Sequence, residues 1–343
     1  MQAIILQCKP RARFHFGNVA PDSNTSLNTT SPWLPSDTLF SALVNIHAEM
    51  HTEKETEAFI GHFDRRDIVI SSGFYCLELA ERWIFFLPKP AHFALRVKEN
   101  FKAFKKVKLI SKTVWEQGLP FEEWQQHCVF LQNGEVVVAK SELEGIVAEE
   151  KAKDIRLFEE WDSPRVKIHA PTREDAYFQL STVSIADNRK NLPADSRVHL
   201  YFLLETAEGF DKTAELMTAI RMLPDRGIGG ERSTGCGQLS GIREDVPFSA
   251  PRIARGAFCS VALTLPSPAQ LGAFQCYDVV TRGGRPYGGE NKKFGFARML
   301  SEGAVALERV GGRVVKIGTN GGHEVKRCGQ PFYLETQLIQ ATP

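Results

Sequence analysis

Residues 227–241 have the sequence GIGGERSTGCGQLSG, which places six glycines within fifteen residues. Glycine reaches backbone conformations with positive φ that other residues rarely adopt, and it lets the backbone approach another group closely. Such a loop can turn successive N–H groups toward an anion. A tight turn whose glycines serve only packing is the alternative that this composition leaves open.

The loop does not fit a Walker A motif. Gly230 and Gly235 have the required spacing, but Cys236 occupies the position of the lysine that neutralises the phosphates. The phosphate in that motif also lies at the N-terminus of the helix that follows the loop. Here the predicted helix, residues 211–223, comes before the loop, so its N-terminus lies at the wrong end.

The loop also fails the dinucleotide-binding pattern, because the third glycine after Gly227 and Gly229 would fall at Arg232. What remains is a permissive backbone with Arg232, Ser233 and Thr234 as side-chain donors. This combination suits an extended anion with several charges, such as an RNA backbone.

The composition sets few limits on function. The chain has 343 residues, which suggests two domains. Its 42 basic and 41 acidic residues balance to a net charge of +1, so any basic surface must be local. Neither a span of about 20 apolar residues nor a signal peptide is visible, so we expect a soluble cytoplasmic protein with no membrane partner. The seven cysteines contain no C-x-x-C pair, which predicts reduced thiols.

The pattern of apolar residues predicts an α+β fold. Residues 1–16 alternate as a strand, and within it Arg11, Arg13 and His15 should share one face. Ser36 is expected to cap a helix at residues 38–50. The helix at residues 211–223, the glycine loop and a strand at 238–243 follow, before a linker at 247–251 and a strand-rich region at 256–337. The resulting β-α-β…α-β order fits a ferredoxin-like, RRM-like sheet.

Catalytic and metal-binding patterns are weaker. His47 and His51 lie one turn apart, but no glutamate stands where a metalloprotease motif needs it, so we expect a solvated helix end and no metal. His15 could act as a general base for RNA cleavage, although a lone histidine more often binds or packs. RNA binding is the function that the first strand, the glycine loop and the basic, aromatic stretch 282–298 have in common.

The motifs resemble the repeat-associated RAMP superfamily, whose glycine loop G-x-G-G-x-x-S-x-G-x-G is matched by residues 227–237. More narrowly, the chain resembles the Cas5-like family that forms subunit 4 of the type III-A (Csm) CRISPR effector complex. The blocks that carry this resemblance, in the family's order, are residues 14–17, 36–43, 70–74, 86–90, 280–284 and 322–329.

This resemblance implies a non-catalytic cap without a cofactor. Members of the family bind the 5′ repeat-derived handle of crRNA and contact the large polymerase-like subunit and the first backbone subunit. The implied fold has a ferredoxin-like domain at residues 1–246, which carries the glycine loop and a protruding β-hairpin, and a degenerate ferredoxin-like domain at residues 252–343.

The resemblance also implies RNA-binding residues. The hairpin is expected near residues 165–177. The candidates carried over are His15, Gly17, Ser36, Asp37, Lys167, His169, Arg173, Gly227, Gly229, Gly230, Arg232, Ser233, Thr234, Gly235 and Gly237.

Three departures and two alternatives accompany the resemblance. The segment at residues 21–35 is longer than the family's usual connection, Cys236 and Gln238 replace residues that are often basic or aromatic in the family, and Glu231 adds a negative charge within the loop. One alternative is a RAMP endoribonuclease that processes precursor crRNA, with His15 as base and a partner such as His169. The other is the equivalent cap of a type III-B (Cmr) complex, which differs in its partners.

Overall fold

The computed structural model describes residues 1–17, 27–79, 82–166, 177–253, 256–284 and 294–339. Within these ranges, no helix combines the length and the apolar character that a membrane span requires. All seven cysteines lie in the described ranges as free thiols, and six of them are buried.

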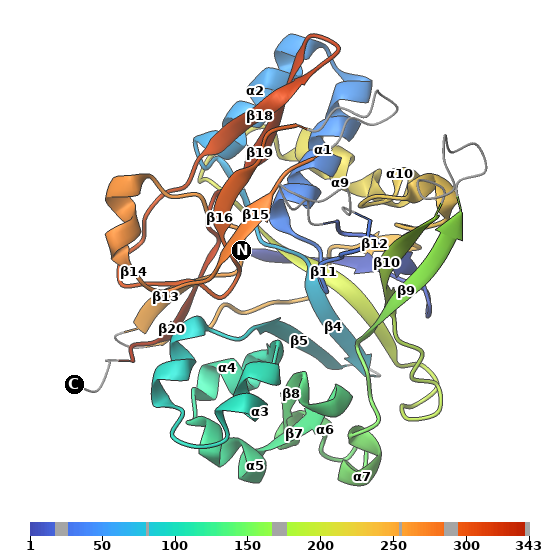
Figure 1. Cartoon of the computed structure of the whole chain (residues 1–343), viewed down its shortest axis with the longest axis vertical. Helices are drawn as coiled ribbons and strands as arrows, with labels where there is room; N and C mark the ends of the chain where they lie inside the picture. Colours follow the sequence, from blue (N-terminus) through green and yellow to red (C-terminus); the bar gives the residue numbers. More distant parts are fainter. Residues whose placement is uncertain (18–26, 80–81, 167–176, 254–255, 285–293, 340–343) are drawn as a thin grey trace.

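The largest sheet of the described residues has nine strands (Figure 1). Its strands, in order across the sheet, are β12 (Gly241–Arg243), β1 (Gln2–Gln7), β11 (Arg197–Thr206), β4 (Phe74–Leu79), β5 (Arg82–Pro88), β6 (Leu109–Ser111), β8 (Val136–Ala139) and β7 (Cys128–Leu131), with β3 (Ile68–Ile70) also on β11. Strands β1 and β4 enclose β11, and β12 returns to β1, as in split β-α-β units. The α+β class is confirmed, and this order agrees with a ferredoxin-like sheet.

Four helices belong to these split units: α1 (Ser36–Met50), α2 (Glu53–Asp64), α9 (Thr213–Arg221) and α10 (Leu223–Arg226). Helix α1 buries Leu39, Leu43 and Ile46, which recur at helical spacing. Helix α2 begins with a capping box in which Thr52 and Glu55 satisfy each other's backbone N–H groups.

The prediction of one strand at residues 1–16 is wrong, because these residues form two strands in different sheets. Strand β1 ends at Gln7, and a turn follows in which Arg11 has φ 66°. Strand β2 (Arg13–Phe14) then pairs with β10 (Tyr177–Ile185) rather than extending β1. Pro10 has no N–H to donate to a ladder, which favours the break at this point.

A helical insertion separates β4 from β11 and lies at the bottom of Figure 1. Its buried centre includes Trp115 and Trp124. Besides β5 to β8, the insertion contains the α-helices α3 (Phe101–Lys106), α4 (Lys112–Gln117), α5 (Trp124–His127), α6 (Lys140–Leu143) and α7 (Glu149–Ala152), and the 3₁₀ helices η1 (Ala91–Arg96), η2 (Phe121–Glu123) and η3 (Gln132–Gly134).

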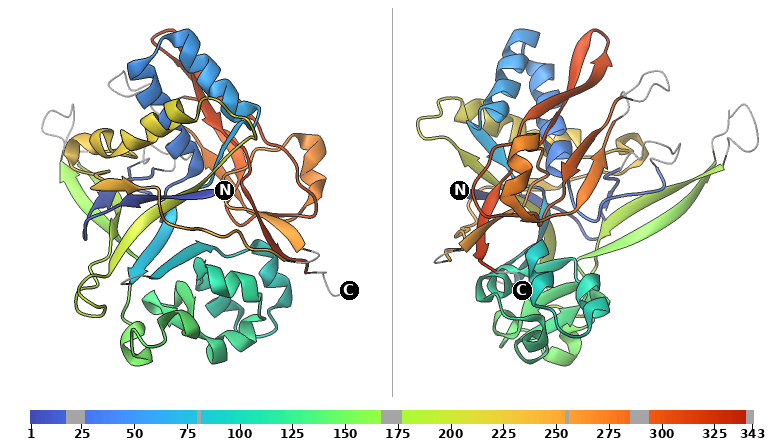
Figure 2. Two further views of the ribbon diagram at one scale, coloured as in Figure 1. Left: turned by 180° about the vertical axis from the view of Figure 1, so that it is seen from behind. Right: turned by 60° about the vertical axis from the view of Figure 1, so that its left-hand side comes forward.

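A β-hairpin projects from the body of the protein, as the right-hand view of Figure 2 shows. It consists of β9 (Phe158–Val166) and β10, which pair over nine residues each. The hairpin predicted near residues 165–177 is therefore present, and the residues between its strands lie outside the described ranges.

The C-terminal region is built from strands, as predicted. These are β13 (Gly256–Ser260), β14 (Phe274–Cys276), β15 (Val279–Arg282), β16 (Ala297–Leu300), β17 (Val305–Ala306), β18 (Val314–Asn320), β19 (His323–Cys328) and β20 (Tyr333–Gln337). Its described residues contain one 3₁₀ helix, η5 (Pro268–Ala273), and no α-helix. The core is shared with the first region, since Cys259 and Leu334 belong to the same buried cluster as β1 and β11. The boundary between residues 246 and 252 stays a prediction.

The two regions are joined by a buried ion pair at the start of α1. Asp37 is fully buried, and Arg282 donates to both of its carboxylate oxygens, at 3.0 and 2.9 Å. The Arg327 guanidinium lies 3.6 Å from the same carboxylate. Burial alone would raise the pKa of Asp37, but the charges of Arg282 and Arg327 outweigh it and hold the pKa below its usual range.

Ser36 belongs to the same junction and is not the predicted side-chain cap. Helix α1 begins at Ser36 itself, after Pro35, and no side chain caps the helix. The Ser36 hydroxyl instead accepts from the Leu263 N–H at 3.0 Å, while the Ser36 N–H donates to Ser72 Oγ at 2.9 Å. Both residues after Pro35 therefore connect the first region to the second.

Replacement of Asp37 by Asn should lower the free energy of unfolding by about 3–5 kcal/mol at pH 7, because two guanidinium groups would stay buried without their carboxylate. Urea denaturation measures this change. The matched control is Glu244→Gln, which neutralises the partner of the exposed Arg221 and should leave the midpoint nearly unchanged.

The same variant has a pH signature. Because the folded-state pKa of Asp37 is lowered, its stabilising contribution is present above the unfolded value of about 3.9 and is lost as pH falls through the folded value. The stability gap between the wild type and Asp37→Asn should therefore narrow on acidification below about pH 4. A gap that stays constant down to acid unfolding would contradict the ion pair.

Candidate RNA interface

The glycine loop joins α10 to β12 and packs along β2. The Gly230 N–H donates to the His15 carbonyl at 2.9 Å, and the Gly237 N–H donates to the Arg13 carbonyl at 2.7 Å. On its other side, β2 pairs with β10 of the hairpin, with Phe14 opposite Val183. The loop and the hairpin are therefore held on opposite edges of the same short strand.

Part of the loop needs glycine for close packing. Gly229 has φ 86°, and a Cβ there would lie 2.7 Å from the His15 carbonyl oxygen. Gly237 has φ 81°, and its Cβ would lie 2.4 Å from the Ile228 carbonyl oxygen. Gly227, with φ 70°, would similarly approach the Gly237 carbonyl oxygen at 3.0 Å. These three glycines support the packing explanation.

The tip of the loop is different. Residues Arg232–Thr234 form the 3₁₀ turn η4, and Ser233, Thr234 and Gly235 are exposed. Gly235 has φ 92°, yet a Cβ there would meet no atom within 4 Å. The tip thus presents side-chain hydroxyl groups to solvent, whereas the N–H groups of Thr234 and Gly235 donate within the turn to the carbonyls of Glu231 and Arg232, at 3.1 and 3.2 Å.

Cationic side chains surround this tip. Arg13 and Arg165 are exposed, and both lie close enough to Cys236 to lower the pKa of its thiol, although burial, the largest effect, leaves that pKa raised. Arg232 is half-buried and donates from Nη1 to the Arg226 carbonyl at 3.1 Å. We call Arg13, Arg165 and the exposed tip, residues 233–235, the loop platform.

Glu231, the acidic departure within the loop, is turned toward the loop itself. It adopts the left-handed conformation with φ 55°, and Thr234 Oγ1 donates to its carbonyl at 2.9 Å and to its carboxylate at 3.3 Å. The negative charge of Glu231 is thus partly compensated by a hydrogen bond from the tip.

His15 is buried rather than displayed beside Arg11 and Arg13, so the expected common face is wrong. Its side chain is 4% exposed, and its Nδ1 donates to the Ser181 carbonyl at 2.7 Å, since a carbonyl only accepts. Arg11 lies in the turn before β2, 3.4 Å from the Asp187 carboxylate. His15 thus connects the hairpin to the glycine loop from within the protein.

Three further predicted contacts have protein partners. The Gly17 carbonyl accepts from Arg282 Nη1 at 3.2 Å, and Ser36 and Asp37 are buried at the junction of the two regions. Their contact with RNA stays a prediction, and the structure gives the side chains of Ser36 and Asp37 a role in joining the two regions.

The hairpin candidates Lys167, His169 and Arg173 lie outside the described residues, so their role also stays a prediction. The described stem carries two features that were not predicted as contacts. Trp161 on β9 is 53% exposed and shares a face of the strand with Arg165, four residues later. An aromatic ring and a guanidinium on one face suit the stacking of bases and the binding of phosphate.

Among the described residues of the basic stretch 282–298, only some are exposed and able to contact RNA. Arg282 is 2% exposed and belongs to the Asp37 ion pair, whereas Phe296 is 51% exposed. Tyr287 lies outside the described residues. The roles of Arg282 and Arg327 were not predicted from sequence, although both lie in the blocks at 280–284 and 322–329 that carry the resemblance.

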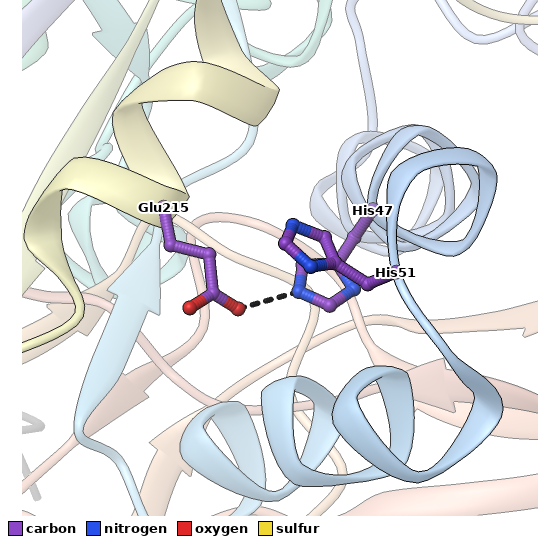
Figure 3. A group of neighbouring side chains, drawn as sticks. All are labelled: His47, His51 and Glu215. Atoms are coloured by element: carbon purple, nitrogen blue, oxygen red, sulfur yellow. Dashed lines mark hydrogen bonds and ion pairs between the residues drawn. The ribbon is translucent and has the colours of Figure 1, made fainter.

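His47 does not lie at a solvated helix end as expected, because its side chain is fully buried. Its ring is stacked between His51 and Phe59, with centroids 4.1 and 4.3 Å away. Glu215 of α9 reaches the same place and accepts from His47 Nε2 at 2.5 Å (Figure 3). Sequence reasoning could pair the two histidines, but it could not bring Glu215 to them.

The division of the glycine loop into a packed part and an open tip can be tested. Gly237→Ala should destabilise the protein by roughly 1–3 kcal/mol, because it combines a strained φ with a clash against Ile228. Gly235→Asn should cost far less, since Asn tolerates the left-handed region and the site is open. Thermal unfolding of both variants measures the difference, and equal losses of stability would refute the division.

The chain is similar to known proteins of CRISPR systems. Residues 254–336 match the family model of the CRISPR Csm4 C-terminal domain. A Csm4 protein of a CRISPR system from Methanocaldococcus jannaschii is 25% identical over 254 residues, which cover 69% of this chain and 64% of that relative. The match therefore spans slightly less than two thirds of the relative's length.

Solved structures agree with the fold over nearly the whole chain. A Csm3–Csm4 subcomplex of a type III-A CRISPR-Cas interference complex contains a chain with a TM-score of 0.70 and 19% identity, covering 98% of this chain and 100% of that one. A Csm1–Csm4 cassette in complex with cA4 gives a TM-score of 0.55 and 17% identity over 99% and 100% of the two chains.

The family model thus matches the C-terminal region, the curated relative covers more than half of the chain, and the solved structures share its overall fold. Residues 254–336 match the Csm4 C-terminal domain model, and the resemblance to Csm4 proteins of CRISPR systems, predicted from the motifs, is confirmed by this match and by the curated relative.

Proposed function

We propose that this protein is a non-catalytic, RNA-binding subunit of a type III-A (Csm) CRISPR interference complex. It binds the 5′ repeat-derived handle of crRNA at the loop platform and joins the large polymerase-like subunit to the backbone subunit. The observation that carries the proposal is the open tip of the glycine loop, which stands beside two exposed arginines.

The chemistry of the tip fits a single-stranded RNA backbone. Ser233 offers an exposed hydroxyl donor, and Gly235 leaves room for a phosphate to approach the main chain. Arg13 supplies positive charge from β2, which contacts the loop, and Arg165 supplies it from β9, two strands further across the same sheet. A strand of RNA across this surface would contact cations and backbone at once, as phosphate recognition needs.

The hairpin also supports the binding of RNA at the loop platform. The hydrogen bond from His15 to Ser181 and the bridge between His15 and Gly230 hold the hairpin and the loop in a fixed relation. Trp161 then offers an exposed ring on the strand face that also carries Arg165. A nucleotide base splayed from the handle could stack there while its phosphate stays at the loop.

The two partner subunits are proposed from the relatives. The similar solved structures are assemblies of Csm4 with Csm3 and of Csm4 with Csm1. An overall fold that matches both over nearly the full chain supports the same pair of partners here, with this protein between them. The insertion and the C-terminal region provide separate surfaces for two neighbours (Figure 1).

A structural rather than catalytic role is supported by the surroundings of His15. A general base must reach the proton that it removes. His15 is buried and donates from Nδ1 to a main-chain carbonyl, so it is placed to position the loop rather than to attack RNA. Processing of precursor crRNA is therefore assigned to another component.

Charge reversal at the loop platform tests the RNA contact. Arg13→Glu and Arg165→Glu should each weaken binding of the handle by about tenfold or more and reduce the salt dependence, since a single strand contributes a log–log slope of about −0.7 per neutralised phosphate. Fluorescence anisotropy with a labelled handle RNA, on the assembled complex, gives both quantities. Lys54→Glu on α2 is the control, because it makes the same charge change at an exposed position away from the platform.

Equal affinity and equal salt dependence in the platform variants and the control would overturn the assignment of this surface to RNA. If the platform variants still assemble with the two neighbouring subunits in size-exclusion chromatography, the proposed subunit role does not depend on the RNA contact. Failure of the wild-type chain to join either neighbour would overturn that role separately.

The non-catalytic assignment has its own test. The wild-type protein and His15→Asn should both leave a labelled precursor crRNA uncleaved when assayed without other subunits, and cleavage by the complete complex should not change. Asn is the appropriate substitution because its amide can still donate to the Ser181 carbonyl. Cleavage by the isolated wild-type chain that disappears in His15→Asn would make the protein the processing enzyme.

A further inference from the structure

A cluster of metal-ligand side chains lies away from the loop platform, where α9 crosses the C-terminal end of α1. His47 lies in the last turn of α1, His51 directly follows the end of that helix, and Glu215 comes from α9, 168 residues after His47 (Figure 3). One potential ligand atom from each of the three lies within 4.8 Å of the others. The cluster belongs to neither the hairpin nor the glycine loop.

The two histidines are placed to act together. The chain leaves α1 in an extended conformation at His51, and the rings of His47 and His51 stack with centroids 4.1 Å apart. The Glu215 carboxylate meets His47 Nε2, and Figure 3 shows it turned toward both rings. Two imidazoles and one carboxylate form a ligand set found at zinc sites that keep an open position.

The surroundings of His47 also suit a ligand. Its second nitrogen, Nδ1, lies 3.1 Å from the buried hydroxyl of Thr56. Metal-binding histidines usually use the nitrogen that is not bound to the ion for such a hydrogen bond, which fixes the ring and its tautomer. Phe59 stacks on the other face of the ring and limits its rotation.

We propose that His47, His51 and Glu215 bind a divalent transition-metal ion, with Zn²⁺ as the best fit. Imidazole ligands favour zinc and its neighbours over Mg²⁺ and Ca²⁺, which prefer oxygen. The ion would fix α9, and the glycine loop that follows it through α10, to the end of α1. The site goes beyond the proposed RNA-binding role and does not depend on it.

The cluster has a route to solvent. His51 and Thr56 line a groove of about 480 Å³ between α1, α2 and the β18–β19 hairpin. Because His51 and Glu215 are themselves only half-buried, water can reach the cluster and supply a fourth ligand.

Small movements would complete the coordination. In a tetrahedral zinc site with bonds near 2.0–2.1 Å, ligand atoms lie about 3.4 Å apart. The distance between His47 Nε2 and the Glu215 carboxylate oxygen would increase from 2.5 Å. Ligand atoms that now lie farther apart, up to 4.8 Å, would move closer together. His51 and Glu215 are half-buried, so their side chains have room to adjust.

The competing explanation is a hydrogen-bonded pair of His47 and Glu215 without an ion, and titration with metal separates the two. Purified protein treated with EDTA should bind one Zn²⁺ per chain with a Kd in the micromolar range or below by calorimetry. Co²⁺ at the same site should give the visible absorption of a tetrahedral complex. Zn²⁺ at 100 times its Kd should raise Tm by about 4 °C or more.

The variants are His51→Ala and Glu215→Gln, because both residues are half-buried and their loss should not unfold the protein. Each should weaken Zn²⁺ binding at least tenfold and remove the Co²⁺ absorption. His62→Ala on α2 is the control, since it deletes a histidine that binds Asp67 elsewhere and should bind zinc normally. Absence of saturable binding, or equal binding in the three variants, would overturn the proposal.

Discussion

The buried carboxylate of Asp37 is the interaction on which the two halves of the molecule depend. It stands at the first turn of α1 and receives Arg282 from β15, while Arg327 of β19 approaches it from the next hairpin. The side chains of Asp37 and Arg282 are buried and that of Arg327 is 14% exposed, and charges so far removed from water are tolerated only because they satisfy one another. The polar contacts of Ser36 with Ser72 and Leu263 surround this pair, so α1 cannot shift without disturbing both regions.

The glycine loop combines two functions that its sequence does not distinguish. Gly229 and Gly237 let the backbone approach β2 closely, whereas Gly235 faces open space. The packed glycines hold the loop against β2, and the tip exposes its side chains to solvent. His15, buried between them and the hairpin, makes the position of the tip depend on β10 as well.

Several features could be predicted from the sequence because they are local. The α+β class and the helix expected at residues 38–50, which begins at Ser36, follow from periodicity and capping, while the hairpin near residue 165 was expected from the family resemblance. The alternation that placed His15 beside Arg11 failed because Pro10 and the turn at Arg11 end the strand. The partners of Asp37 and of His47 could not be found, since 245 and 168 residues separate them in the chain and nothing local indicates their contact.

The shape of the nine-stranded sheet also limits how neighbouring chains can attach. Its path ends at β12 and β7, which have three and four residues. Edges this short expose few main-chain hydrogen-bonding groups, so they offer little template for another strand. Longer free edges of the described residues lie in the smaller sheets, such as the nine-residue strand β9 at the edge of the three-stranded sheet, so an added strand would pair there more readily than with the large sheet.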